Sequence, residues 1–536
     1  MSLRTLSKKS NQALELGLYA IEFMQSNQKI DSKVYERVKM FNTDAVVCGI
    51  SALALKTNAP TILRKEALEH YEVTNNNRYK SKVFGSNKWV HVEKAILANN
   101  AAVREWDSNG TVFGYNKNIK SHQAGEFGHN DFYSVALAAA HNNNNLNGHD
   151  VLKGMLLSDE IRGRLAEVFS LKSYKIDHVV HGAIATAATY GAMIGASAEE
   201  IEHAIGMVVA HYIPFRAIRA GKQLSDSKGS SAALSSEVAI MSMKRAMSGF
   251  VGPKNIFSNP EAIFRYFTKS EECPFDIAVG FEGSDFAVMG MHFKLGLYEH
   301  QSAGAIQGLI KLLQENDSLY SDGNLDKIKK INVTAYEPCF GIIGDPAKRN
   351  PTTRQSADHS MVFILSRLIK KAIDNPNNIK KNVSDSNRFW DSLMLTPLDY
   401  SGEALRCQKT RKIMDKVNFF HGGKEYDDKY PEGIPSKVDI ELENGKTLSS
   451  GFVMFPPGHS ANNTHDLKGT LNYKSNLYLQ FCQLPQNTID KFLNNLNNIE
   501  KLNNKELENL YDLPLNYSNV SIDEDGFDII KYNNKI

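Results

Sequence analysis

The sequence lacks the cysteine patterns that mark metal centres and disulfide scaffolds. Its five cysteines are far apart and include no Cys-x-x-Cys pair, which argues against a zinc or iron–sulfur site built on close cysteines. Five is an odd number, and a chain this large does not need disulfides to fold, so we expect free thiols and a cytoplasmic location. In a eukaryote, the mitochondrial matrix would also fit. The basic first residues contain no apolar segment of the secretory type.

Long apolar runs and an excess of one charge are also absent. The stretch 183–198 is broken by Thr, Tyr, Gly and Ser, and it falls short of the roughly 20 lipid-soluble residues of a membrane span. The 62 Lys and Arg residues nearly balance the 60 Asp and Glu residues, for a net charge of +2. A broad basic face for nucleic acid is therefore not indicated. We expect neither a membrane nor a nucleic acid as a partner.

The sequence motifs of common cofactors and nucleophiles are missing. There is no GxGxxG after a strand, no P-loop, no GxSxG elbow and no HExxH. These absences predict a protein without an organic cofactor or a metal. They narrow an enzymatic role to hydrolysis, isomerisation or elimination.

The periodicity of the chain changes near residue 285. Before it, helical patterns dominate; they include 132–141, 181–196, 197–211 and 230–247. Ser197 followed by Glu200 is typical of a capping box. After it, residues 330–336 predict a strand, and Asn-Gly between 437–442 and 447–455 predicts a hairpin.

The sequence thus predicts an α+β protein with a large all-α helical domain and a smaller α/β lid domain. With 536 residues, the chain is too long for one ordinary core. We place the helical domain at 1–287 and the lid at 288–468. A C-terminal helical segment, 469–536, is expected to pack back on the helical domain.

Two segments combine imidazoles with carboxylates. The glycine-containing stretch 104–131 includes Asp107 and His129, and it could bring an acid and a base to one cleft or be a solvated loop. His178 and His181 begin a helix of small residues. A histidine at a helix start has a lowered pKa. The pair fits structural histidines, a catalytic or substrate-binding histidine, or a metal pair, although no third ligand follows at the expected spacing.

Two further segments are basic. Four cations lie within residues 216–228, interleaved with Ser and Gly; they are Arg216, Arg219, Lys222 and Lys228. Such a cluster suits a substrate with several carboxylates, and the alternative is a solvated basic turn. Lys294 lies in an apolar context where the composition changes. It could act as a base, anchor a carboxylate, or be a lysine whose head reaches solvent at a domain boundary.

Together these segments resemble the MmgE/PrpD family, which includes 2-methylcitrate dehydratase and cis-aconitate decarboxylase. The resemblance rests on segments in family order: WDSNGT (106–111), GEFGHND (125–131), the helix 177–195, RAIRAGKQLSDSKG (216–229), SMKRAMSGFVGP (242–253), HFKLGLYEHQSAGA (292–305) and DPAKRNPTTRQSADHSM (345–361). They cover most of residues 30–470. No single segment would be specific.

The resemblance implies a homodimer without metal or organic cofactor, with its active site between a helical domain and a lid. It implies a small tricarboxylate substrate, with dehydration of 2-methylcitrate in propionate catabolism as the first expectation. Aconitate hydration, isomerisation or decarboxylation in the same site, and a non-catalytic carboxylate-binding relative, remain alternatives. Matching the family's site positions residue by residue gives Asp107, Thr111, His129, His178, Lys222 and Lys294.

These residues suggest separate roles in binding and in proton transfer. Arg219, Lys222 and Lys294 would hold carboxylates and stabilise developing charge, together with Arg216 and Lys228 of the same basic segment, while Thr111 contacts the substrate. Asp107 and His129 would form the acid–base pair, and His178 would orient the substrate or share the proton transfer.

Two departures from the family pattern bear on the choice of reaction. Phe363 replaces a site tyrosine of the decarboxylase branch, which argues against decarboxylation. The loop containing GYNKNIKSHQ is longer than in the decarboxylase and could alter substrate choice.

Overall fold

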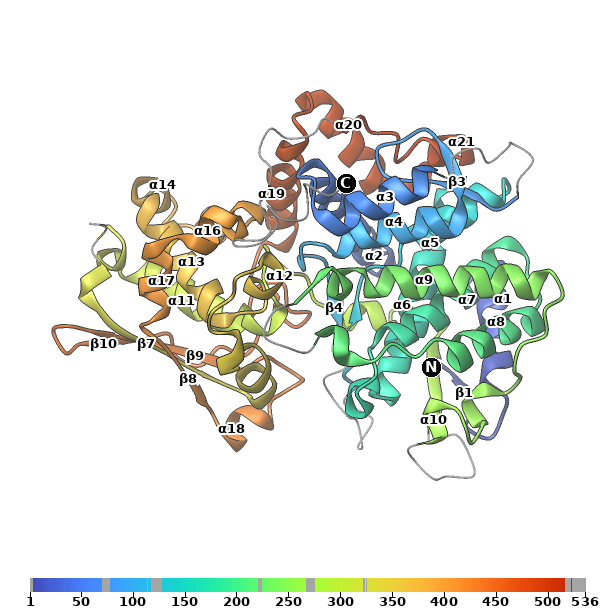
Figure 1. Ribbon diagram of the computed structural model, residues 1–536, viewed down its shortest axis with the longest axis horizontal. Coiled ribbons are helices and arrows are strands. Elements are labelled where there is room, and N and C mark those ends of the chain that lie inside the picture. The colour runs from blue at the N-terminus through green and yellow to red at the C-terminus, as the bar shows by residue number, and fades with distance from the viewer. Residues whose placement is uncertain are drawn as a thin grey trace, which may run out of the picture.

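The computed structural model describes residues 3–69, 78–112, 114–116, 128–219, 224–266, 275–321, 323, 325–515 and 522, with backbone only at 128 and 129. Figure 1 shows two lobes: helices from the first half of the chain form one, and a sheet with its covering helices forms the other. Segments around β4 and α12 lie where the lobes meet. The protein is α+β and mainly helical, as the sequence predicted.

The first lobe is built from ten helices within the described residues. They are α1 Gln12–Gln25, α2 Ser32–Ala54, α3 Asn58–Glu69, α4 Val92–Arg104, α5 Ser134–Asn142, α6 Gly148–Val168, α7 Val179–Ile194, α8 Ala198–His211, α9 Asp226–Met247 and the short α10 Ile263–Tyr266. Helix α9 packs on α4, α7 and α8, and α6 packs on α7. This arrangement brings the start of α7, the start of α9 and the end of α4 to one side of the lobe.

Small side chains allow α7 to occupy the centre of this lobe. A Cβ atom at Gly182 would lie 2.0 Å from the ring of Phe132, so only glycine permits this approach. The predicted capping box of α8 is confirmed, because the Ser197 hydroxyl accepts the Glu200 N–H and the Glu200 carboxylate accepts the Ser197 N–H. The predicted helices over 132–141, 181–196, 197–211 and 230–247 correspond to α5, α7, α8 and α9.

Three two-stranded ribbons interrupt the predicted all-α character of this lobe. They pair β1 Leu3–Leu6 with β6 Ile277–Gly280, β2 Lys80–Lys82 with β3 Trp89–His91, and β4 Thr111–Val112 with β5 Gly128–His129. Strands of two to four residues carry too little alternation to be recognised in sequence. Thr111 of β4 also exchanges backbone hydrogen bonds with His292, which ties this ribbon to the chain entering the second lobe.

A four-stranded sheet with the order β10-β9-β7-β8 forms the base of the second lobe. Its strands are β7 Ile328–Ala335, β8 Val417–His421, β9 Ser436–Leu442 and β10 Thr447–Ser449. The predicted strand over 330–336 and the predicted hairpin are both present, but β10 ends at Ser449. Strand β8, which runs parallel to β7, was not predicted.

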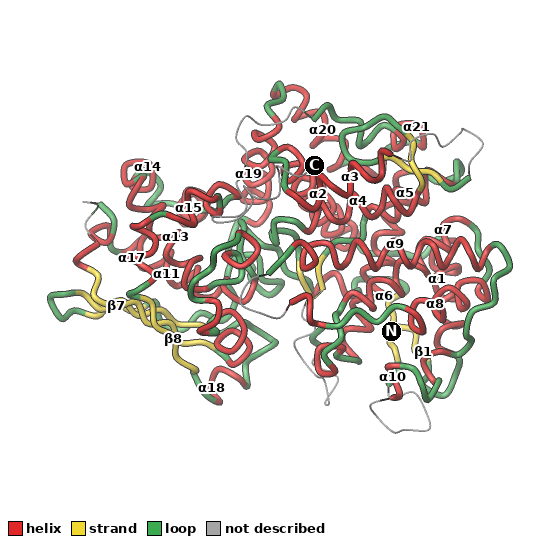
Figure 2. The backbone as a smooth tube through the Cα atoms, viewed as in Figure 1, coloured by secondary structure: helices red, strands yellow, loops and turns green. Residues whose placement is uncertain are grey.

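Helices cover this sheet, as the tube in Figure 2 shows. The described helices of this lobe are α11 Ala303–Glu315, α12 Arg354–Ala357, α13 Met361–Asp374, α14 Pro376–Lys380, α15 Ser386–Leu393, α16 Gly402–Arg406, α17 Gln408–Met414 and α18 Lys424–Asp427. Helix α11 packs on β9 and on α13, and α13 packs on α17.

The last described helices are α19 Leu467–Leu479, α20 Gln486–Asn497 and α21 Asn504–Glu508. Helices α19 and α20 contact α2, and α21 contacts α5, so this end of the chain lies on the first lobe (Figure 1). The domain boundaries at 287 and 468 stay a prediction. Over the described ranges, no single helix is both long and apolar enough to cross a membrane, and only α2 with α3, bent by 89°, passes such a test as a pair.

Candidate active site

The end of α4 places a carboxylate inside a cluster of cations. Asp107 follows the helix in the left-handed backbone region, with φ of 47°, and its side chain is fully buried. Its carboxylate forms ion pairs with Arg104 at 2.7 Å and with Lys294, and it lies 3.4 Å from Lys228 Nζ. A non-glycine residue in this region is strained, and such strain persists where surrounding contacts impose it.

These contacts decide the charge of Asp107 and Lys294. Burial alone would raise the pKa of Asp107, but the charges of Arg104, Lys294 and Lys228 outweigh it and hold that pKa well below its usual value. Burial lowers the pKa of Lys294, against the opposing effect of Asp107. Asp107 therefore stays ionised at neutral pH and acts as the counter-charge of the cluster.

A second group approaches Asp107 from the short helix α12 and the residues after it. His359 Nε2 lies 3.2 Å from the Asp107 carboxylate, and His359 Nδ1 lies 2.5 Å from Asp358 Oδ1. The imidazole thus stands between two carboxylates. Burial, aided by Lys228, lowers the pKa of His359 to about 4, so the ring is neutral at neutral pH.

Buried ion pairs hold this segment in place. Arg354 pairs with Glu105 through its side chain and donates to the Glu105 carbonyl at 3.0 Å. Its guanidinium also lies 5.0 Å from the centre of the Trp106 ring. The residues before Asp107 and the residues before His359 are therefore joined directly across the lobes.

Asp107, Asp358 and His359 are also the one described group with ligand atoms close enough for a metal, within 4.8 Å of one another. However, the Lys228 ammonium lies 3.0 Å from Asp358 and 3.4 Å from Asp107, so it bridges both carboxylates. A divalent cation there would have to displace Lys228. We therefore describe the group as an ion-pair cluster and assign it no metal.

The start of α7 contributes a third group. Asp177 accepts two hydrogen bonds from Arg219, one of them at 3.2 Å from Nη2 to Oδ1, and Arg219 Nη2 lies 3.3 Å from His178 Nε2. Burial would raise the pKa of Asp177, but Arg219 and His178 lower it below its usual value. Burial lowers the pKa of His178, so its imidazole is neutral. Arg219 and His178, which belong to two separate segments of the sequence, thus lie side by side.

These groups surround one cavity between the lobes. Its described lining comprises Arg104, His178, Arg216, Arg219, Leu224, Lys228, Glu299, Gln301, Ile342, Lys348 and His359. Five of these side chains are cations and one is a carboxylate. Asp107 contacts Lys228 and His359 from behind this lining. A strongly cationic, partly enclosed cavity is suited to a small ligand with several carboxylates.

Glu299 is the one acidic side chain in that lining. It precedes the one-turn helix His300–Ser302, where its Oε2 accepts the Gln301 N–H at 2.7 Å. Burial raises the pKa of Glu299 to about 7, even though Lys294 opposes the shift. The carboxyl group is thus shared between its protonated and ionised forms near neutral pH.

The structure brings together most of the predicted site residues. His178, Arg216, Arg219 and Lys228 line the cavity, while Asp107 and Lys294 lie directly behind it. Thr111 is fully buried in β4 and is not in the described lining. His129 is described by its backbone alone, in β5 opposite Thr111, and Lys222 lies outside the described residues. The proposed roles of His129 and Lys222 stay predictions.

Four ionisable residues of the described lining were not predicted from the sequence. They are Arg104, Glu299, Lys348 and His359. A signal existed for Glu299, Lys348 and His359, since all three belong to segments that carry the family resemblance. Phe363, by contrast, is fully buried against Tyr400 with ring centres 5.7 Å apart, and the described lining does not include it. It therefore does not by itself distinguish dehydration from decarboxylation.

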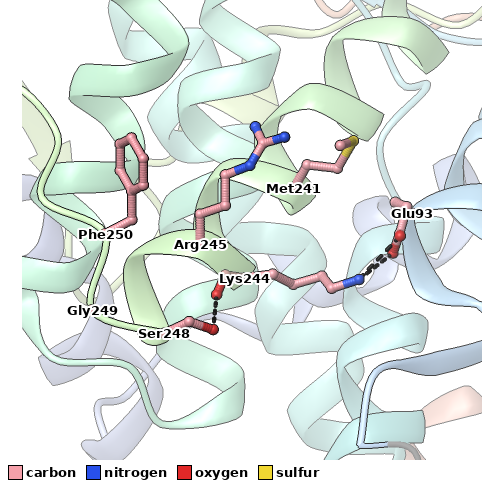
Figure 3. Close-up of a pocket in the computed structure, with 7 residues that line it drawn as sticks. All are labelled: Glu93, Met241, Lys244, Arg245, Ser248, Gly249 and Phe250. Carbon is pink, nitrogen blue, oxygen red and sulfur yellow. Dashed lines mark hydrogen bonds and ion pairs between the residues drawn. The ribbon is translucent and has the colours of Figure 1, made fainter.

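A second depression lies at the C-terminal end of α9, with about 900 Å³ of empty space (Figure 3). Figure 3 shows Lys244 directed toward Glu93, with which it forms an ion pair at 2.9 Å, and Arg245 extending in another direction. This depression is more open and offers neither a histidine nor a second carboxylate in its described lining. The cavity between the lobes is the stronger candidate for a catalytic site.

Comparison with known proteins agrees with the class that this fold and cavity suggest. Residues 23–276 match the family model of the MmgE/PrpD N-terminal domain. Over this part, just under half of the chain, the protein is therefore similar to the N-terminal domain of MmgE/PrpD proteins, in agreement with the resemblance seen in the sequence segments.

The relatives named as dehydratases share only 21–23% of their aligned residues with this chain. The 2-methylcitrate dehydratase of Escherichia coli O157:H7 is 21% identical over 345 residues, covering 63% of this chain and 65% of the relative. A probable 2-methylcitrate dehydratase of Saccharomyces cerevisiae is 23% identical over 349 residues, covering 63% and 61%. The alignments thus span less than two thirds of those relatives. A fungal alkylcitrate dehydratase, phiI, is 21% identical over 467 residues, covering 86% of this chain and 87% of the relative.

Proposed function

We propose that this chain is a cofactor-independent hydro-lyase that dehydrates a small tricarboxylate. The observation that carries the proposal is the cavity between the lobes, in which five cations and two neutral histidines face one carboxyl group. The names of the relatives, 2-methylcitrate dehydratase and alkylcitrate dehydratase, point to citrate derivatives. Dehydration of 2-methylcitrate to 2-methyl-cis-aconitate, a step of propionate catabolism, is the first reaction to test.

Some cations line the cavity, and others lie behind its lining. Arg216, Arg219 and Lys228 line the cavity and would bind substrate carboxylates, with Lys222 expected to join them. Removing a proton next to a carboxylate places negative charge on that group, and fixed cations in a water-poor cavity stabilise such charge strongly. Lys294 would contribute to this field through its contact with Asp107.

His178 is suited to positioning the substrate. Its neutral ring lies in the lining, and its Nε2 is held beside Arg219 Nη2 at 3.3 Å. Because Asp177 fixes Arg219 through two hydrogen bonds, the guanidinium and the imidazole present a defined polar edge to the cavity. Asp107 is better suited to holding the cation cluster than to proton transfer, since its pKa lies well below its usual value. His129 stays a candidate for the acid or the base.

The experiment is an activity panel on purified protein after chelation of metals. Citrate, 2-methylcitrate and cis-aconitate are supplied separately, and products are identified by NMR. We expect 2-methylcitrate to lose water. Carbon dioxide from cis-aconitate would assign a decarboxylase, and interconversion of citrate and isocitrate would assign an aconitate isomerase. Binding of these acids without any turnover would assign a non-catalytic relative, and the proposal would be rejected.

Two further expectations concern the whole protein. A homodimer is proposed from the family resemblance, and size-exclusion chromatography with light scattering tests it. A cytoplasmic location stays a prediction from the cysteine pattern.

A further inference from the structure

Glu299 occupies a position suited to a proton donor. The binding of substrate carboxylates by the cations of the cavity does not account for a carboxyl group in the lining. One oxygen, Oε2, is fixed by the Gln301 N–H at 2.7 Å. Its side chain lines a cavity otherwise rich in cations, yet it forms none of the ion pairs found among the described residues. A carboxyl group that is held by a backbone donor, faces a ligand cavity and forms no ion pair with a described cation can hold a proton for the ligand.

His359 has the complementary position. Asp358 Oδ1 lies 2.5 Å from Nδ1, the closer of the two carboxylate contacts of the ring. A proton held on Nδ1 by this contact would leave Nε2 as the basic nitrogen. Asp107 Oδ2 lies 3.2 Å from that Nε2. A neutral ring gains little from this second carboxylate, but an imidazolium formed by accepting a proton at Nε2 would be stabilised by it. The arrangement resembles a general base held by one carboxylate and stabilised by another.

We propose that Glu299 is the general acid and His359 the general base of the elimination. This inference rests on the proposed function and names the groups that transfer protons within it. The two side chains lie on segments joined by a hydrogen bond from the Glu299 N–H to the Asp358 carbonyl, at 2.9 Å. Both therefore reach the same cavity from one rigid junction of the lid lobe.

The elimination transfers two protons and breaks one C–O bond. His359 Nε2 takes the proton from the carbon next to a substrate carboxylate, and the electron pair of that C–H bond forms the C=C bond. The C–O bond of the neighbouring carbon breaks, and the departing oxygen takes the proton of the Glu299 carboxyl to leave as water. The enzyme is left with an imidazolium and a carboxylate. The imidazolium then releases one proton to solvent and the carboxylate takes one up, which restores both groups.

The environments of the two groups favour these roles at neutral pH. Burial raises the pKa of Glu299 to about 7, with Lys294 and Lys348 opposing and Asp107 assisting. Burial and Lys228 lower the pKa of His359 to about 4, with Asp107 and Asp358 opposing. Among the described residues, the backbone N–H of Gln301 donates a hydrogen bond to the Glu299 carboxylate. Two titratable groups with pKa values pushed apart are typical of an acid–base pair.

The test of Glu299 uses the isosteric variant Glu299→Gln and two substrates. On the natural hydroxy acid, we expect turnover to fall by about 10²–10⁴-fold. On an analogue with fluorine in place of the departing hydroxyl, fluoride leaves without a proton, so the variant should keep activity within a few-fold of wild type. Equal losses on both substrates, or no loss on the hydroxy acid, would overturn the role.

The pH profile gives a second measurement that does not need the analogue. In wild type, kcat/KM should fall above pH about 7 as Glu299 loses its proton. Glu299→Asp should retain a falling limb, and the residual activity of Glu299→Gln should lack it. A limb that persists unchanged in Glu299→Gln would assign the acid to another group.

The test of His359 is chemical rescue. His359→Ala should lose about 10²–10⁴-fold in turnover while still binding the tricarboxylate, and added imidazole should restore part of the rate. Retained activity, or a loss in folded, ligand-binding protein that imidazole does not restore, would overturn the assignment and favour His129.

Matched controls come from buried groups of the same type elsewhere. Burial raises the pKa of Glu167 to about 7 as well, and it lowers that of His141 to about 4, but neither lines the cavity. Glu167→Gln and His141→Asn should leave kcat/KM within a few-fold of wild type. If wild type itself turns over no tricarboxylate, the proposed function fails and this assignment fails with it. If wild type is active and the variants behave as their controls, only the assignment fails.

Discussion

The backbone N–H of Glu299 donates to the carbonyl of Asp358 at 2.9 Å. These residues are far apart in sequence. Glu299 itself lines the cavity, and Asp358 directly precedes His359, which also lines it. Arg354, four residues before Asp358, pairs with Glu105 at the end of α4. A continuous set of buried contacts thus connects the helical lobe, the cation cluster around Asp107 and the segment carrying His359. Such preorganisation keeps charged groups in place before a ligand binds.

Replacing Arg219 should weaken substrate binding. Arg219→Gln removes a cation of the lining and its bond to Asp177, and we expect kcat/KM to fall by about 10–100-fold, mainly through KM. Arg219→Lys should recover little, because an ammonium cannot reproduce the paired donors that Asp177 accepts. Steady-state kinetics on the active tricarboxylate measures both. Arg245→Gln, in the depression of Figure 3, is the control, and an equal effect there would refute a local role.

Neutralising Asp107 should destabilise the fold. Asp107→Asn leaves Arg104 and Lys294 buried without their counter-charge, so the free energy of unfolding should fall by about 3–5 kcal/mol. Urea unfolding monitored by fluorescence measures the change. Asp374→Asn, which breaks an exposed pair with Lys370, should change it by less than about 1 kcal/mol. Similar values for the two variants would contradict the buried cluster.

Ligand binding can be measured without turnover through thermal stability. A tricarboxylate at about 100 times its Kd should stabilise the native state by about 2.7 kcal/mol. Citrate should raise the melting temperature more than succinate at equal concentration and ionic strength, since it can engage more of the five lining cations. Scanning fluorimetry on wild type and on Lys228→Gln compares the two acids. Equal shifts for citrate and succinate would contradict selection by carboxylate number.

Acid should destabilise the fold through a buried histidine of the second lobe. His459 packs on His292 with ring centres 4.1 Å apart, and burial lowers the pKa of His459 to about 4. An unfolded histidine titrates near 6.5, so stability is full above that pH and is lost as the pH falls toward 4. The loss from His459 alone is on the order of 3 kcal/mol.

The matched variant for this prediction is His459→Asn, whose side-chain oxygen can still accept the Ala461 N–H that His459 Nδ1 accepts at 3.1 Å. Unfolding in urea at pH 7.5 and at pH 5 should show a smaller pH dependence for the variant than for wild type. An identical pH dependence would show that His459 does not carry this effect.

Much of the architecture could be predicted because it depends on local patterns. The small residues of α7, the Ser197 and Glu200 cap and the Asn-Gly turn each specify an element through contacts within a few residues. The basic segment 216–228 likewise predicted a carboxylate-binding cluster, and three of its cations line the cavity. The ribbons of two to four residues were missed, because their pairing joins segments that carry too little periodicity of their own.

The sequence by itself determined the helices, the mixed second lobe and the cationic character of the site, since composition and periodicity act locally. Only the tertiary structure decided which ionisable groups share one low-dielectric space. Asp107 is flanked by Arg104, Lys294 and Lys228, which keep it charged. Glu299 forms no ion pair with any described cation, and burial raises its pKa to about 7. The pKa values of two carboxyl groups are therefore shifted in opposite directions. Burial and the distance to the nearest charge set these pKa values, and neither quantity can be read from the sequence alone.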